Sequence, residues 1–220
     1  MLETRFPRVV GDIGNPATFE FPVRYAVVRG ASPRRVGRNA DPALRQPFIS
    51  AARELVQQGA TAIRTSGGFL VRFQQALQET LPVPVWTSSL LLIPELQAQL
   101  PMGRSVGVVT VDAQALGPAH LRAAGAPIET PVEGLEPGRA FQRCLLDDKP
   151  TLDIEEARAA TVAAAMRLVA RRRDVGAIAL ECTNMPPHAG AVRRATGLPV
   201  HDITNLLARR FPPARDNPLP

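Results

Sequence analysis

The sequence predicts an α/β protein built from two similar lobes, each with a largely parallel sheet flanked by helices. Short apolar segments alternate with longer amphipathic ones along the 220 residues. Hydrophobic residues make up 45% of the chain, which is enough for sizeable cores. A segment of the first half also returns in the second half. Together these observations favour a duplicated parallel α/β unit.

The repeat has a constant spacing of 115 residues. The Ala-Ile pair at 62–63 recurs at 177–178, and the Pro-Val pair at 84–85 recurs at 199–200. The interval between the turn and the Pro-Val pair is also the same in both copies, so we infer a duplication. The expected domains are a first lobe at 1–95 with 202–220 and a second lobe at 96–201.

The elements follow from local patterns. Strands are expected where short apolar runs are bounded by turn residues, at 25–28, 62–63, 83–86, 105–110 and 177–181. Helices are expected where apolar residues recur every three or four positions, at 43–58, 113–124 and 153–173. Asp153 is expected to cap the last of these, with two acids in its first turn and three arginines at its end. The proline-rich tail at 211–220 is expected to form no helix.

Composition and charge exclude several classes of protein. The net charge of +6 comes from arginines dispersed along the chain, without the interleaved aromatics of a single-strand nucleic-acid surface. No apolar run approaches the roughly 20 residues of a membrane span, and the amino terminus lacks a signal-peptide pattern. We expect a cytoplasmic protein with no nucleic-acid or membrane partner. Its three histidines lack metal-ligand spacing, so no metal is expected.

Cys182 is the leading candidate for a reactive group. It ends the apolar run at 177–181 and precedes a Thr-Asn-Met-Pro-Pro sequence that is typical of a helix start. Helix amides lower the pKa of a nearby thiol, so we expect a depressed pKa here. The alternative is a small buried hydrophobe, the expected role of Cys144. At the duplicated position the first lobe has Gly67, not a cysteine.

Three segments carry a family resemblance: Glu-Cys-Thr-Asn-Met-Pro at 181–186, Thr-Ser-Gly-Gly-Phe at 65–69, and Gly-Asp-Ile-Gly-Asn-Pro-Ala-Thr-Phe at 11–19. They resemble the aspartate/glutamate racemase superfamily. The resemblance implies a cofactor-independent enzyme with two α/β lobes, related by a pseudo-twofold axis, and an active site in the cleft between them. It also implies a small carboxylate or dicarboxylate substrate, and it leaves monomer or homo-oligomer open.

Gly67 departs from the family pattern of one cysteine in each lobe. Racemisation requires one group to remove a proton and another to return it on the opposite face, and glycine has no such group. Enzymes of the arylmalonate decarboxylase type are similar in having a single cysteine. This similarity implies that Cys182 protonates an enediolate after decarboxylation. The substrate-binding and oxyanion residues would be Asn15, Thr65, Ser66, Gly67, Gly68, Thr183 and Asn184.

Other interpretations stay open. The chain could be an amino-acid racemase or isomerase with an impaired first base, or an inactive relative that binds a small carboxylate. Gly67 and Gly68 could be no more than tight-turn glycines. His188, one turn beyond Cys182, either tunes the thiol or is structural. Arg64 either binds a second carboxylate or points outward.

Overall fold

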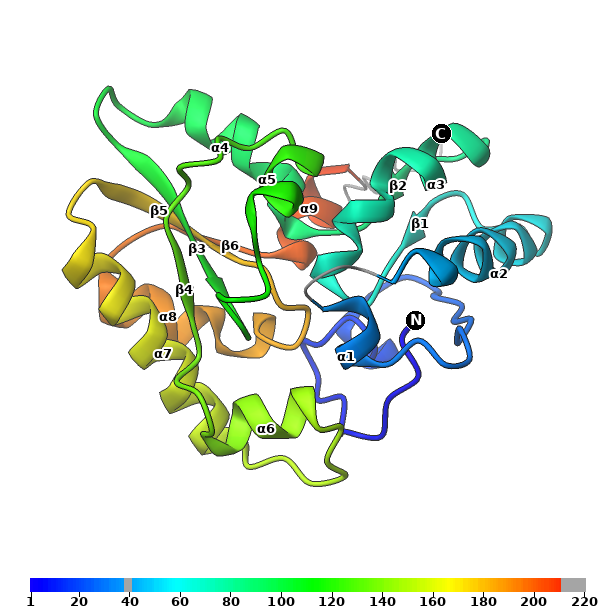
Figure 1. Cartoon of the computed structure of the whole chain (residues 1–220), viewed down its shortest axis with the longest axis horizontal. Helices are drawn as coiled ribbons and strands as arrows, with labels where there is room; N and C mark the ends of the chain where they lie inside the picture. The colour runs from blue at the N-terminus through cyan, green and yellow to red at the C-terminus, as the bar shows by residue number, and fades with distance from the viewer. Residues whose placement is uncertain (38–40, 211–220) are drawn as a thin grey trace, which may run out of the picture.

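Two parallel sheets form the centre of the fold (Figure 1). The computed structural model describes residues 1–37 and 41–210. The larger sheet has the strand order β4-β3-β5-β6, and the smaller one pairs β1 with β2. All of these strand pairs are parallel. The strands are β1 (Ile63–Arg64), β2 (Val85–Trp86), β3 (Ser105–Thr110), β4 (Val132–Gly134), β5 (Val175–Leu180) and β6 (Val200–His201). The α/β class and four of the five expected strands are confirmed.

Helices cover both sheets. On the larger sheet, α7 packs against β3, β4 and β5, α8 packs against β6, and α4 contacts β3. Figure 1 shows α7 and α4 on opposite sides of this sheet. On the smaller sheet, α2 contacts β1 and α3 contacts β2. The helices are α1 (Pro33–Val36), α2 (Arg45–Gln57), α3 (Gln74–Thr80), α4 (Ile93–Gln99), α5 (Pro118–Ala123), α6 (Ala140–Leu146), α7 (Ile154–Arg171), α8 (Ala189–Thr196) and α9 (Ile203–Arg210). Short 3-10 segments are η1 (Pro16–Thr18), η2 (Pro42–Leu44), η3 (Gly68–Phe73), η4 (Ser89–Leu92) and η5 (Pro186–His188).

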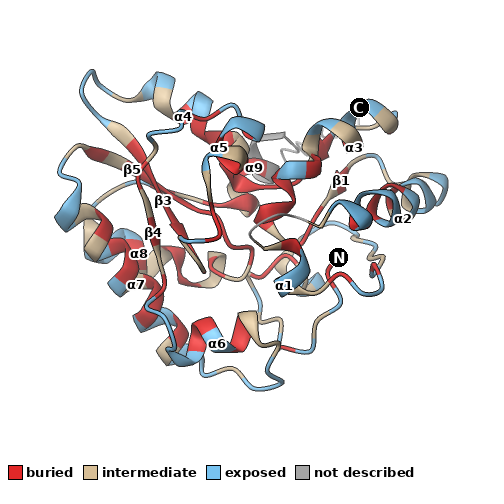
Figure 2. Cartoon of the chain, viewed as in Figure 1, coloured by how far each residue is buried: buried red, intermediate tan, exposed pale blue. Residues whose placement is uncertain are grey.

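Helix α7 forms where the sequence predicts it. The Asp153 side chain accepts hydrogen bonds from the backbone amides of Glu155 and Glu156, both at 3.0 Å. These bonds satisfy two of the amides that every helix start leaves free. Buried alanines, including Ala157 and Ala164, lie on the face of α7 that packs against the rest of the protein, β3, β4 and β5 included. Their small side chains let the helix approach the larger sheet closely, and the outer face of α7 is exposed (Figure 2).

The two sheets repeat one local register. Ile63 pairs with Val85 in the smaller sheet, and Ile178 pairs with Val200 in the larger sheet, 115 residues later in each strand. In both copies the isoleucine amide donates to the carbonyl of the proline before the paired valine, at 2.9 Å. The structure therefore reproduces the sequence repeat at the level of strand pairing. The turns after β1 and β5, which hold Gly67 and Cys182, occupy matching places.

Two predicted elements are wrong in extent or type. Residues 25–28 form no strand, because only Val28 makes a single parallel bridge, with Leu2. The helix expected at 113–124 begins only at Pro118, since Asp112 instead accepts amide hydrogen bonds that hold residues 114 and 115 in a turn. The tail prediction for 211–220 lies outside the described residues.

Most of the buried hydrophobic residues belong to two clusters. Figure 2 shows that the buried residues lie on the strands and on the inner faces of the helices. The smaller cluster surrounds β1 and β2 and includes Ile63, Leu77 and Val85. The larger one surrounds β3 and β5 and also takes in η4 and α4 through residues such as Leu90 and Ile93. The segment before the predicted domain boundary at 95/96 thus contributes side chains to the larger core. No helix in the described ranges is long and apolar enough to cross a membrane.

Candidate active site

A pocket lies between the two sheets. Its volume is about 440 Å³, which includes space that is open to solvent. The turns after β1, β3 and β5 all reach it, so it lies at the carboxyl ends of parallel strands, where α/β folds commonly bind ligands. Its lining is mostly apolar and consists of Leu2, Phe6, Pro33, Val36, Ser66, Gly67, Gly68, Phe69, Val111, Leu145, Leu146, Glu181, Cys182, Thr183 and Asn184. Six of the eight predicted site residues line it; Asn15 and Thr65 do not.

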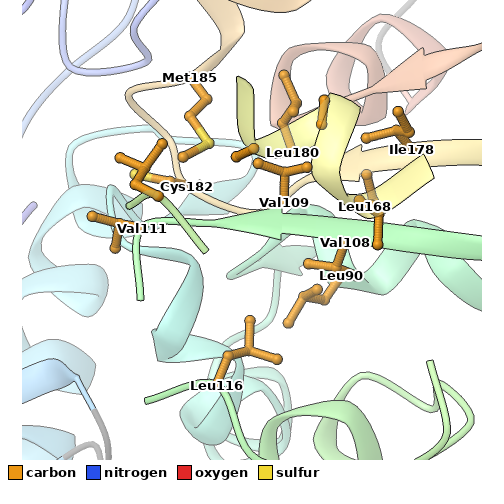
Figure 3. Packing of buried hydrophobic residues seen from close by; sticks show 14 of the residues in the cluster. Leu90, Val108, Val109, Val111, Leu116, Leu168, Ile178, Leu180, Cys182 and Met185 are labelled. Carbon is orange, nitrogen blue, oxygen red and sulfur yellow. The ribbon is translucent and has the colours of Figure 1, made fainter. Parts of the chain in front are cut away.

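Cys182 lies in the turn after β5, at the edge of the larger core. Figure 3 shows it beside Val111 and Met185. Its Sγ donates to Asn184 Oδ1 at 3.5 Å. Burial raises the pKa of the thiol, and the Glu181 carboxylate raises it further, while the Asn184 backbone amide acts in the opposite direction. Cys182 is therefore a neutral thiol near pH 7.

The predicted depressed pKa of Cys182 is wrong for a structural reason. The residues after Cys182 form a turn and then η5, and α8 begins only at Ala189. The thiol consequently receives no field from the start of an α-helix, and desolvation determines its pKa. A thiol that keeps its proton suits the role of a proton donor.

Glu181 is a second ionisable group at the pocket, directly before Cys182. Its side chain is fully buried, and Oε2 accepts a hydrogen bond from Thr110 Oγ1 at 2.6 Å. Oε1 has no hydrogen-bond partner among the described residues. Burial raises the pKa of this carboxyl to about 7. A Cβ at position 68 would overlap with Glu181 Oε1, so the turn needs glycine at Gly68 to accommodate the carboxyl.

A polar chain connects Cys182 to the amino-terminal segment. Asn184, whose Oδ1 accepts from the thiol, donates through Nδ2 to Asp12 Oδ2. Asp12 in turn pairs with Arg8 Nη1 at 3.1 Å. Burial raises the pKa of Asp12, and the Arg8 guanidinium opposes that shift. Because both ends of the Asn184 amide are bonded, its orientation beside Cys182 is fixed.

Gly11 lets the amino-terminal segment approach the Cys182 turn. Its φ of +99° lies in the left-handed region, and a Cβ there would stand 3.1 Å from Pro187. A larger residue would push Asp12 away from Asn184. The glycine-containing motif at 11–19 therefore contributes to the site through Asp12.

The predicted hydroxyl donors differ in availability. Thr65 Oγ1 donates to the Thr87 carbonyl at 2.7 Å, and Thr183 Oγ1 donates to the Ser66 carbonyl at 2.9 Å. Both protons are thus engaged by backbone oxygens. Ser66 Oγ accepts from the Leu2 amide at 2.9 Å, which leaves its own proton for a ligand.

Backbone amides are the other donors at the pocket. Those of Gly67, Cys182 and Thr183 have no hydrogen-bond partner within 1–37 and 41–210. Gly67 and Cys182 belong to matching turns, so the amides come from both halves of the repeat. With the Ser66 hydroxyl they form a donor set suited to a carboxylate or an oxyanion.

Several sequence candidates lie away from the pocket lining. Asn15 caps η1: its Oδ1 accepts from the Ala17 amide at 2.9 Å, and its Nδ2 donates to the Arg8 carbonyl at 2.7 Å. Arg64 reaches the Ile203 carbonyl at 3.5 Å and lies over the Phe19 ring. Neither side chain is available to a substrate in the pocket.

Two of the histidines and the second cysteine are buried side chains with a structural role. His188 packs edge-on against Phe141, and burial lowers its pKa to about 4. His120 packs against Phe69 in the same manner. Cys144 is buried on α6, as predicted. No group of three or more potential ligand side chains in the described part of the chain is arranged to hold a metal ion.

A model of the Asp/Glu/hydantoin racemase family matches residues 72–211, a stretch that includes Cys182. The chain belongs to this family. The match covers more than half of the chain and confirms the resemblance seen in the sequence motifs. It also confirms the expectation of an enzyme of the racemase superfamily, a lyase or an isomerase.

Curated relatives extend the similarity to nearly the whole chain. A dimethylsulfoniopropionate lyase of Durusdinium sp. clade D is 30% identical over 210 residues, covering 91% of this chain and 69% of that protein. Dimethylsulfoniopropionate lyases 7 and 6 of Emiliania huxleyi are each 28% identical and cover 99% of this chain. The chain spans 66% and 59% of these two relatives.

One solved structure supports the fold, and a second is reported beside it. Allantoin racemase from Pseudomonas fluorescens aligns with a TM-score of 0.52 at 23% identity, covering 80% of this chain and 73% of that one. Arylmalonate decarboxylase aligns with a TM-score of 0.49 at 19% identity over 72% of this chain and 70% of that one. At 23% identity, the likeness to allantoin racemase concerns the fold alone.

Sequence reasoning missed Glu181, Asp12 and Arg8. Glu181 carries a visible signal, since it is an acid at the end of an otherwise apolar run. Asp12 lies inside the glycine-containing motif, where Asn15 was the expected contributor. Arg8 has no such local signal, because only the fold brings it beside Asp12.

Proposed function

We propose that the protein is a lyase that forms a carbanion at the carbon next to a substrate carboxylate, with Cys182 as its acid/base. The observation that carries this proposal is the pairing of Cys182 with Gly67 at matching positions of the repeat. Racemisation needs a proton-transfer group on each face of the carbanion. Loss of a leaving group or of carbon dioxide needs only one. A site with one thiol therefore favours a lyase over a racemase.

The curated relatives indicate the first substrate to test. Dimethylsulfoniopropionate carries a carboxylate and a sulfonium on adjacent carbons of its chain. In an elimination, a base removes the proton from the α carbon, the electron pair forms the Cα–Cβ double bond, and the Cβ–S bond breaks. The products are acrylate, dimethyl sulfide and a proton held by the base. No proton has to return to the α carbon.

The pocket offers a role for each part of such a substrate. The Ser66 hydroxyl and the amides of Gly67, Cys182 and Thr183 would hold the carboxylate and stabilise the charge that develops on it. Cys182 would first lose its own proton to water, and the resulting thiolate would then take the α proton. A bound sulfonium cation would favour that ionisation, because a nearby positive charge lowers the pKa of a thiol.

Decarboxylation is the second candidate, and the neutral thiol of Cys182 supports it. In that reaction carbon dioxide leaves first, and Cys182 then protonates the enediolate, so the resting thiol already has the required proton. The substrate would be a malonate with an aryl or alkyl substituent, seated in the apolar part of the pocket.

A panel of substrates tests the proposal. The purified protein is incubated with dimethylsulfoniopropionate, phenylmalonate and the L-isomers of aspartate and glutamate. Dimethyl sulfide is measured in the headspace, carbon dioxide by a coupled assay, and racemisation by optical rotation. We expect release of dimethyl sulfide. Carbon dioxide alone would replace elimination with decarboxylation. Racemisation alone would favour the isomerase interpretation, and binding without turnover would favour an inactive carboxylate-binding relative.

A further inference from the structure

The charge of the pocket lining is unusual for a site that binds carboxylates. Among the lining residues, Glu181 and Cys182 are the ones with ionisable side chains, and none is a lysine or an arginine. A substrate with two carboxylates would bring its second negative charge into an apolar pocket that already contains the Glu181 carboxyl. Like charges repel strongly where water is scarce. The lining therefore disfavours dianions and suits a ligand with a net charge of zero or above.

Glu181 lacks a compensating positive charge of its own. Thr110 satisfies Oε2, whereas Oε1 has no partner and no exposure to solvent. An ionised carboxylate buried in this way is stabilised only by a nearby cation, and none of the residues that line the pocket is one. The guanidinium of Arg8 lies over the Phe6 ring but is paired with Asp12. The bonded Oε2 and the close fit against Gly68 hold the carboxyl in place.

The shape of this arrangement suits a cation that makes no hydrogen bonds. Because Oε1 is covered, an ammonium with N–H groups cannot reach it directly. A sulfonium or quaternary ammonium group needs no hydrogen bond, since its charge acts through the field at a distance of several ångströms. Its methyl groups pack well on apolar and aromatic surface, which Phe6, Phe69 and Leu145 provide at the pocket.

The inference that follows rests on the proposed function. We propose that Glu181 selects onium carboxylates, that is, substrates whose β substituent is a sulfonium or quaternary ammonium group. Glu181 is here a positioning and specificity residue. It attracts the cationic end of the substrate while the Ser66 and Gly67 turn holds the carboxylate, so that the α carbon lies toward Cys182. The same charge disfavours malonates and other dicarboxylates.

A matched pair of unreactive ligands isolates this effect. The onium 3-(trimethylammonio)propanoate and the neutral-headed 4,4-dimethylpentanoate have the same shape, and quaternary nitrogen is a poor leaving group. Binding of each is measured by titration calorimetry at pH 8 with the wild type, Glu181→Gln and Glu133→Gln. The last variant removes an acid that is bonded to Arg167 and Arg171 away from the pocket.

The wild type is expected to prefer the onium ligand by about tenfold or more, as a charge pair in a partly dry pocket implies. Glu181→Gln should abolish this preference, and Glu133→Gln should retain it. Equal affinities for the two ligands in the wild type, or an unchanged preference in Glu181→Gln, would overturn the inference. Should Glu181→Gln fail to fold, the wild-type preference still decides, and Glu181→Asp should keep it.

The outcome is separable from that of the proposed function. A wild type that prefers the onium ligand but releases no dimethyl sulfide from dimethylsulfoniopropionate would keep the selectivity and reject the lyase activity. A wild type that releases dimethyl sulfide with the same KM as Glu181→Gln would keep the activity and reject the role of Glu181.

Discussion

Glu181→Gln should change how the free energy of unfolding depends on pH. The size of that change measures the pKa shift of the buried Glu181 carboxyl. The pKa of Glu181 rises from 4.5 to about 7 on folding because of burial. The protonated form is therefore favoured in the folded protein. The contribution of the protonated carboxyl to the free energy of unfolding is fully present below pH 4.5 and is lost as the pH rises through 7. A shift of this size corresponds to about 3 kcal/mol. Glutamine cannot ionise, yet it keeps an acceptor for Thr110.

The assay is urea unfolding of the wild type and Glu181→Gln at pH 5 and pH 8, followed by circular dichroism. From pH 5 to pH 8, we expect the free energy of unfolding of the variant to rise by roughly 2–3 kcal/mol relative to that of the wild type. Asp12 and His188 also have shifted pKa values, but they are present in both proteins. Burial raises the pKa of Cys182, so this thiol keeps its proton in both proteins between pH 5 and pH 8 and the difference reports Glu181. The same stability difference at both pH values would refute a raised pKa for this carboxyl and with it the picture of an uncompensated buried acid.

Three further results are expected. Gly67→Cys should fold, since the backbone there is extended (φ −154°) and the atom nearest to the new Cβ is the flexible end of the Leu2 side chain, at 3.1 Å. The variant should gain racemisation of L-aspartate or L-glutamate, followed by optical rotation, because a second thiol can return the proton on the opposite face; an equal rate in the parent would contradict the one-thiol interpretation. Cys182 should alkylate slowly at pH 7, and Glu181→Gln should move its labelling profile to lower pH; an unmoved profile would show that the carboxylate does not raise the pKa of the thiol. Asp153→Ala should remove the cap of α7, cost about 1 kcal/mol and lower Tm by about 2–4 °C in a thermal melt; an unchanged Tm would contradict the capping role.

Elements determined by short-range patterns were predictable from the sequence. Helix α7 has its cap, its acidic first turn and its alanine face within one continuous segment. The repeat at 62–63 and 177–178 likewise predicted two matching strands, which form with the same register. Residues 25–28 have an equally apolar pattern, but a strand needs a neighbour along its length, and here only Leu2 bridges to Val28.

The electrostatics of the site could not be predicted from local sequence. The pKa of Cys182 depends on burial by residues such as Val111 and Met185, and on where α8 begins. Burial raises the pKa of Glu181, and the hydrogen bond from Thr110 opposes that shift. Thr110 and Gly68, which contact this carboxyl, are both distant from it in the chain. The sequence motifs predicted which turns form the pocket. The charged groups that act on these turns come close to them only when the two halves of the repeat pack together.

The most direct test of the account compares two cysteine variants in the dimethyl sulfide assay. Cys182→Ser removes the thiol at the pocket, and Cys144→Ser removes a buried thiol on α6 as a matched control. We predict that Cys182→Ser lowers the rate of dimethyl sulfide release by about 100-fold or more, the usual contribution of a general acid/base, and that Cys144→Ser stays within about twofold of the wild type. Wild-type rates in Cys182→Ser would contradict the central claim that this thiol carries out the proton transfer.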